Sequence, residues 1–108
     1  MNGRTRSYEA QSVILEARVE EVSAESTTSG SFTKLLCEVT ASKHRNFNHM
    51  SGKQTTIYWH ISGLPNFEDG DRLIVYATPK GIENSTIKYS RRIDKVDEHG
   101  SMISRYFC

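Results

Sequence analysis

The side chains best suited to chemistry in this chain are aromatic rings with cations nearby in the sequence. Tyr58 and His60 alternate within an apolar stretch, and Phe47 lies in the polar segment before it. Flat rings stack on nucleobases and cations bind phosphates, so this mixture is typical of single-stranded nucleic-acid binding. The candidate binding residues are these rings, the basic side chains that precede them, and two cations of the predicted strand over residues 86–96: Lys34, Lys43, Arg45, Phe47, Lys53, Tyr58, His60, Lys88 and Arg92.

The charge balance constrains how such a site can be built. The 108 residues carry 14 Lys and Arg against 13 Asp and Glu, a formal net charge of +1. This balance excludes a uniformly basic protein. The charges are nevertheless separated along the chain. Residues 43–53 hold three cations and no acid, residues 79–95 hold five cations against two acids, and residues 16–25 hold four acids against one cation. A basic side is therefore compatible with a neutral total.

Two other interpretations of the same residues stay open. Tyr58 and Tyr76 also suit ordinary cross-strand packing, the lysines also suit solvated loops, and Glu38 on the face of Tyr58 disfavours phosphate.

Alternatively, the chain is a protein-interaction or assembly module. Four apolar side chains fall on outward positions of their strands: Ile14, Leu36, Ile74 and Tyr76. Clustered exposed apolar residues mark partner or dimer contacts.

The elements that must position these residues are strands. Val, Ile, Thr, Tyr, Phe and Trp together number 33, whereas Leu and Ala number only 10, a composition that favours an all-β fold. Alternation of apolar and polar residues predicts five strands. They span residues 12–24, 32–42, 54–61, 72–78 and 86–96, and the first has a bulge near Glu20-Glu21 because Val22 breaks its alternation.

The predicted domain organisation has three parts. Residues 1–11 are a flexible polar leader, residues 12–97 are a single β-barrel domain, and residues 98–108 are a tail. The tail is amphipathic and aromatic, so it suits a sixth strand, a short helix or an apolar hook for another copy of the chain. Closing five antiparallel strands into a small barrel would avoid leaving two long exposed sheet edges.

The strand order resembles a known plan. A long bulged first strand, a hairpin, a third strand, and then Gly70-Asp71 followed by the apolar start of the fourth strand resemble the OB-fold, over about residues 12–97. The resemblance implies a five-stranded antiparallel Greek-key barrel. The helix usual between strands three and four must be short or absent, because only residues 62–71 are available. The resemblance also implies that single-stranded DNA or RNA binds across strands two and three, with little sequence specificity.

Other chemistry has weak support. His44, His49 and His60, with Cys37 or an acid, match no zinc-ligand spacing, so no metal or other cofactor is expected. Neighbouring acids on a strand point to opposite faces, and no nucleophile–base or Gly-rich phosphate motif is present. We therefore expect a non-enzymatic protein.

The cysteines and the hydropathy pattern bear on the compartment. Cys37 lies in an apolar run and Cys108 is the last residue, which favours two free thiols in a reducing interior. No apolar stretch approaches the length of a membrane span, and no apolar segment typical of a signal peptide follows the charged N-terminus. We expect a cytoplasmic protein with no membrane partner.

Overall fold

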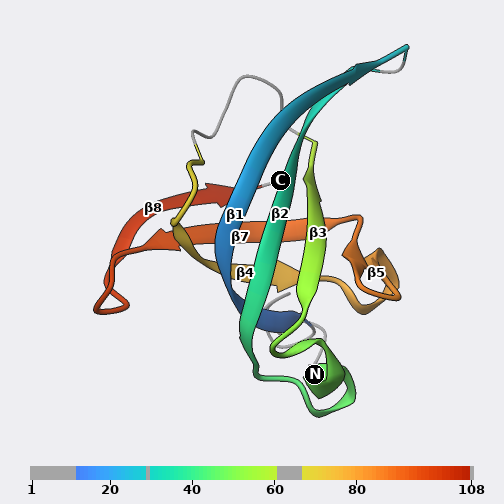
Figure 1. The fold of residues 1–108 in the computed structure, drawn as a ribbon. Helices are drawn as coiled ribbons and strands as arrows, with labels where there is room; N and C mark the ends of the chain where they lie inside the picture. The colour runs from blue at the N-terminus through green and yellow to red at the C-terminus, as the bar shows by residue number, and fades with distance from the viewer. Residues whose placement is uncertain (1–11, 29, 61–66, 108) are drawn as a thin grey trace, which may run out of the picture.

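The computed structural model describes residues 12–28, 30–60 and 67–107, and almost all of its regular structure is strand (Figure 1). Its elements, in chain order, are β1 (Val13–Thr27), β2 (Gly30–Ser42), the 3-10 helix η3 (Arg45–Met50), β3 (Gln54–Trp59), β4 (Arg72–Ala77), the 3-10 turn η4 (Pro79–Gly81), β5 (Ile82–Glu83), β6 (Thr86–Ile87), β7 (Ser90–Val96) and β8 (Met102–Phe107). The all-β prediction is confirmed.

The strands form one eight-stranded sheet in the order β5-β6-β3-β2-β1-β4-β7-β8. The predicted five-stranded closed antiparallel barrel is wrong, because the sheet is open, has eight strands and is mixed: β3 and β6 run parallel. β1 bends so strongly that β4, β7 and β8 run across the direction of β2 and β3 (Figure 1).

Two local features account for two of the three extra strands; the third is the two-residue β5, which lies before β6 in a segment not predicted as strand. The predicted strand over residues 86–96 breaks at Lys88 and Tyr89, so that β6 pairs with β3 while β7 pairs with β4. The segment expected as a tail forms β8, the strand alternative among the three considered, and pairs with β7. The predicted short or absent helix between strands three and four falls partly on residues 61–66, outside the described residues; residues 67–71 contain a turn.

The long first strand follows its predicted pattern. Val13, Leu15, Ala17 and Val19 are buried, as alternation requires. The register against β2 shifts twice, between Glu16 and Ala17 and between Val19 and Glu21. The second shift is the bulge predicted near Glu20-Glu21. Because a bulge inserts one extra residue, it returns Val22 to the core side, where it packs against the core.

The core gathers the inward side chains of six strands, and Trp59 is its largest side chain. Leu35, Ile57, Ile87 and Ile93 are fully buried in it, and Phe67 closes it against the ring of Tyr106, with ring centroids 5.6 Å apart. Alternation predicts that Ile57, Trp59 and Ile61 share one face and that Ile87, Tyr89 and Ile93 point inward, and the sequence between the third and fourth predicted strands suggests that Leu64 and Phe67 close one end of the core. Burial of Ile87, Ile93 and Phe67 is confirmed. The prediction that Tyr89 points inward is wrong, because Tyr89 lies in the break between β6 and β7 and is 60% exposed. Predicted core positions Ile61 and Leu64 lie outside the described residues.

Adjacent leucines on β2 provide a matched test of this arrangement. Leu35 is fully buried, whereas Leu36 is half-buried on the outer face. We expect Leu35→Ala to lower the free energy of unfolding by about 2–5 kcal/mol through lost burial and a cavity. Leu36→Ala should cost less than half as much, and equal losses in urea denaturation would contradict the assigned faces.

The thiol of Cys37 gives a second test. It is free and buried, and burial, with a smaller contribution from the charge of Glu20, raises its pKa to about 12. The reactive thiolate is therefore scarce at neutral pH. In a Cys108→Ser background, we expect a disulfide reagent to label Cys37 only when denaturant unfolds the chain. Rapid labelling of the folded protein at pH 7 would show that this site is not closed.

Candidate nucleic-acid interface

The outer face of β2 and β3 brings rings from both strands together. Alternation turns Phe32 and Lys34 outward from β2, and Tyr58 outward from β3, where it is the register partner of Lys34. The rings of Phe32 and Tyr58 meet edge to face, with centroids 5.4 Å apart. His60 follows β3, and the centroid of its ring lies 5.8 Å from the ring centroid of Phe32. The three rings thus form one contiguous group, in edge-to-face and tilted arrangements of the kind that aromatic pairs favour.

A fourth ring joins from a segment distant in sequence. Tyr89 stacks on His60 with centroids 5.5 Å apart and ring planes 27° apart. The Nε2–H of His60 donates a hydrogen bond to the carbonyl oxygen of Lys88 at 2.9 Å, which fixes the imidazole against the same segment. We call Phe32, Tyr58, His60 and Tyr89 the ring cluster.

Lysines lie at two sides of the ring cluster, and each is matched with an acid. Lys88 Nζ contacts Glu83 Oε1 at 2.6 Å. This hydrogen bond and the accompanying charge attraction lower the pKa of Glu83 and raise that of Lys88. Lys34 Nζ lies 3.8 Å from a carboxylate oxygen of Glu25. Both pairs are solvent-exposed, so they stabilise the fold little and can exchange partners.

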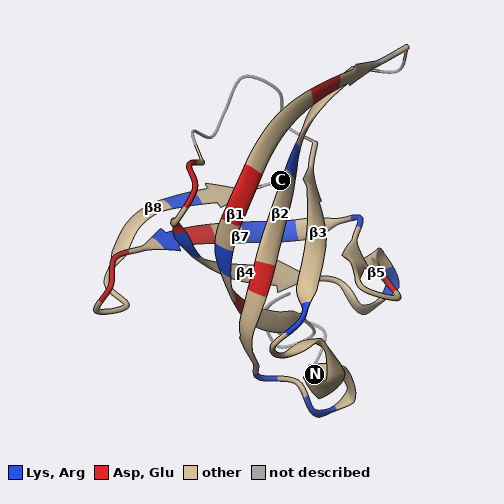
Figure 2. Cartoon of the chain, viewed as in Figure 1, with Lys and Arg blue, Asp and Glu red and all other residues tan. Residues whose placement is uncertain are grey.

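The charges are graded across this face. Figure 2 shows acids along β1 and a basic residue at the neighbouring part of β2. A shallow groove of about 160 Å³ separates the two, lined by Glu21, Ser23, Lys34, Leu36 and Thr56. Acids thus lie on the β1 side of this face, whereas Lys34 and Lys88 are each held by a carboxylate.

Four of the predicted binding residues lie at the opposite end of β2 and β3. Lys43 follows β2 and Lys53 precedes β3, with Arg45 and Phe47 in η3 between them. Lys34 and Lys43 are nine residues apart, roughly 30 Å along an extended strand. Arg45 and Lys43 border an open hollow of about 530 Å³, but Phe47 packs against the core. The predicted site is therefore two separate groups of residues.

Arg92 belongs to neither group. Only 5% exposed, it lies on β7 with its guanidinium 3.8 Å above the ring of Tyr76. Its Nη2 donates to a carboxylate oxygen of Asp94 at 3.2 Å, and Asp94 also accepts two hydrogen bonds from Arg105, at 3.0 and 3.3 Å. The prediction that Arg92 binds phosphate is therefore corrected. Because the predicted strand breaks at Lys88 and Tyr89, Arg92 lies on β7, which pairs with β4 and not with β3, and its side chain belongs to a buried ion cluster.

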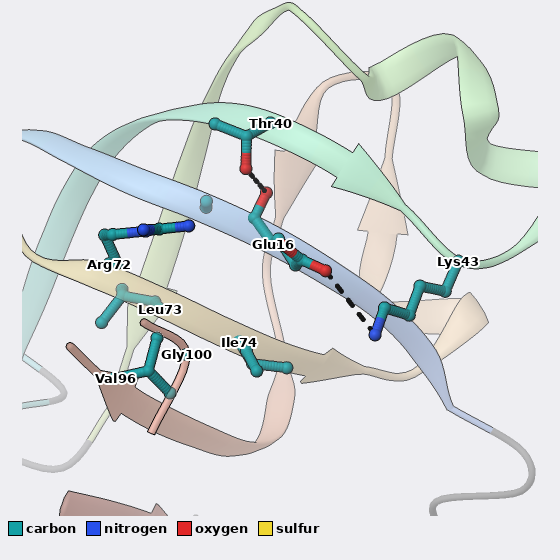
Figure 3. Close-up of a pocket in the computed structure, with 9 residues that line it drawn as sticks. Glu16, Thr40, Lys43, Arg72, Leu73, Ile74, Val96 and Gly100 are labelled. Atoms are coloured by element: carbon teal, nitrogen blue, oxygen red, sulfur yellow. Dashed lines mark hydrogen bonds and ion pairs between the residues drawn. The ribbon is translucent and has the colours of Figure 1, made fainter. Parts of the chain in front are cut away.

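A polar pocket of about 220 Å³ lies on the outer face of β1 and β4 (Figure 3). Lys43 contacts the carboxylate of Glu16 across its mouth at 3.6 Å, and Thr40 donates to the carbonyl oxygen of Glu16 at 3.2 Å. Arg72 donates to the carbonyl oxygen of Glu98 at 2.7 Å. These internal contacts occupy the pocket's charged groups, so we do not assign it to the interface.

The histidines are spread over the molecule. His44 and His49 flank Phe47 on η3, while His60 lies in the ring cluster. Within residues 12–28, 30–60 and 67–107, no group of three or more His, Cys, Asp or Glu side chains could hold a metal ion. Over the same residues, no helix is long and apolar enough to span a membrane.

Sequence reasoning missed two members of the ring cluster. Phe32 shares strand parity with Lys34, and that signal could have placed it on the outer face. Tyr89 was assigned to the core because residues 86–96 were treated as one unbroken strand. Its neighbour Lys88 was predicted, and the two leave the sheet together.

Comparison of the chain with protein-family models, with curated proteins and with solved structures found no match. What can be inferred about the site therefore rests on its own geometry.

The buried ion cluster makes a prediction about stability. Asp94→Ala would remove the buried carboxylate that accepts hydrogen bonds from both Arg92 and Arg105, so we expect a loss of about 3–5 kcal/mol in the free energy of unfolding. Glu38→Ala is the matched control, because Glu38 holds Arg18 at 3.0 Å in an exposed pair worth about 0–1 kcal/mol. Similar losses for both variants in chemical denaturation would contradict the assignment of Asp94 as the buried partner.

Proposed function

We propose that this protein binds single-stranded nucleic acid with little sequence specificity through the ring cluster, with Lys34 and Lys88 contacting phosphates. The observation that carries the proposal is the convergence of four rings from three chain segments on one exposed face between two lysines. Every base has a flat face, so stacking accepts any sequence.

The charges around the ring cluster suggest how the strand would lie. Glu21 and Glu25 on β1 would repel phosphates, so the backbone would avoid β1 and cross the ring cluster from Lys34 to Lys88. The bases would then point across Tyr89 and Tyr58. Because each lysine must give up a carboxylate partner, binding should be modest at physiological salt. Two phosphate contacts predict that log K falls with log salt at a slope of about −1.4 for a single strand.

An OB-like architecture is part of the same proposal. Its support is the neighbour order β3-β2-β1-β4-β7, together with the parallel pairing of β3 with β6, two residues before β7. OB-folds bind oligonucleotides on the face formed by strands two and three, and the ring cluster lies on β2 and β3. The architecture and the site thus favour the same ligand class.

A second candidate function is the protein-interaction or assembly module. It is favoured by the exposed apolar side chains of β8. The outward apolar residues expected to carry it are only partly exposed: Ile14, Leu36, Ile74 and Tyr76. β8 is thus its better support.

The binding proposal is tested by fluorescence anisotropy with an end-labelled, mixed-sequence single-stranded oligonucleotide at low salt. We expect saturable binding that weakens as salt rises. Tyr89→Ala or Tyr58→Ala should each raise Kd about 5- to 150-fold, which corresponds to the roughly 1–3 kcal/mol of one stacked base. Phe107→Ala, at an exposed ring on β8, is the matched control and should leave Kd unchanged.

A charge variant separates this site from general electrostatic attraction. Glu83→Gln removes the carboxylate that holds Lys88 without removing the lysine, so it should tighten binding, whereas Lys88→Ala should weaken it. Lys43→Ala, at the far end of β2, should matter little for a short oligonucleotide. Absence of saturable binding, or equal effects of Lys43→Ala and Lys88→Ala, would contradict the proposal.

A further inference from the structure

The two outer strands of the sheet differ in how well they are protected. β5 is two residues long, and the ion pair between Glu83 and Lys88 spans it and the segment after β6. β8 has six residues and pairs only with β7 among the described strands. Proteins usually shorten, charge or bend an outer strand to prevent intermolecular pairing. β5 follows that rule and β8 does not.

The side chains of β8 strengthen the contrast. Three of the four large exposed apolar residues in the described part of the chain lie on this strand: Met102, Ile103 and Phe107. Its one charged residue, Arg105, reaches back to Asp94 on β7 through two hydrogen bonds. The guanidinium is thus directed toward β7 and away from the outer edge. What remains at the edge is backbone and apolar surface.

We propose that β8 pairs with β8 of a second copy of this chain, antiparallel, about a two-fold axis through Arg105. A two-fold contact must be complementary to itself, and β8 meets that condition in this register. Ile103 of each copy would lie opposite Phe107 of the other, and Ser104 opposite Tyr106. Apolar cross-strand pairs of this kind stabilise antiparallel strands.

The alternative centre of symmetry is less favourable. An axis through Ser104 would place Ile103 opposite Arg105 of the second copy, which sets an apolar side chain against a charge. An axis midway between Ser104 and Arg105 would place these two residues directly opposite each other. Regular pairing excludes this arrangement, because directly opposed residues share a face of the sheet whereas neighbours on a strand point to opposite faces. In the proposed register the two Arg105 side chains are opposed, but each is held by Asp94 of its own copy, which reduces the usual like-charge penalty.

The contact would join two sheets into one continuous sheet while leaving both ring clusters open. β3 and β2 lie toward the opposite end of the strand order from β8. A six-residue edge is a small interface, so the dimer should be weak: it should form at high protein concentration and dissociate on dilution. This inference does not depend on nucleic-acid binding, although a dimer would present two ring clusters to one long strand.

Sedimentation velocity of the full chain over a roughly hundredfold concentration range tests the proposal. We expect a monomer–dimer equilibrium that Ile103→Lys weakens at least tenfold. Tyr89→Lys is the control, because Tyr89 lies outside β8 and is 60% exposed, close to the 58% of Ile103. The Tyr89→Lys variant should dimerise like the natural chain. Conversely, Ile103→Lys should bind the oligonucleotide with unchanged affinity per chain at concentrations where the protein is monomeric, which separates this proposal from the binding proposal.

Cysteine crosslinking tests the register in a Cys108→Ser background. Ile103→Cys and Phe107→Cys, mixed as two proteins and oxidised, should form a mixed disulfide-linked dimer much faster than either protein alone. A monomer at all concentrations, a dimer insensitive to Ile103→Lys, or no preference for the mixed crosslink would each overturn the proposal. Circular dichroism of each variant shows whether the fold is retained, as expected for exposed positions.

Discussion

The fold depends on one constraint: β1 must pair with two different neighbours at once. It hydrogen-bonds to β2 over nearly its whole length and to β4 over its first six residues. Two bulges interrupt the register of the β1–β2 pair, one at Glu20 of β1 and one at Thr40 of β2, and such bulges increase the local twist of the strands. They let the apolar face of β1 stay in the core while the strand bends from one set of strands to the other. Without β1, the β2–β3 pair and the β4–β7–β8 group would not meet, since β2 and β4 do not pair.

The face proposed to bind nucleic acid depends on a second constraint, at the turn before β5. Gly81 donates its backbone N–H to the hydroxyl of Thr78 at 2.9 Å, and its carbonyl oxygen accepts from the backbone N–H of Lys88 at 2.7 Å. A Cβ atom at Gly81 would lie 2.6 Å from the carbonyl oxygen of Tyr89, closer than packed atoms allow. Only glycine lets the segment of Lys88 and Tyr89 approach this turn, and that approach brings the Tyr89 ring beside His60.

Charge serves two different purposes in this molecule. Exposed pairs such as Lys34 with Glu25 and Lys88 with Glu83 are screened by solvent and contribute little to stability, as the proposed exchange of their carboxylates for phosphates requires. Asp94 is buried and holds two arginines, so its charge cannot be exchanged without a large cost. The near-zero net charge therefore includes two kinds of ion pair: a buried structural cluster on β7 and β8, and exposed pairs near β3 that contribute little to stability.

Local patterns in the sequence determined much of this protein. Alternation determined which residues of β1, β2, β3 and β4 face the core, because side chains on a strand alternate between faces. The break in that alternation at Val22 also located the bulge. Tertiary structure alone decided how the last third of the chain divides into strands and which strands pair. The same alternation is compatible with one strand over residues 86–96 or with two, and the contacts of Gly81 and the pairing of β6 with β3 select two. That choice exposed Tyr89, buried Arg92 and made β8 an outer strand, because each outcome depends on neighbours distant in sequence.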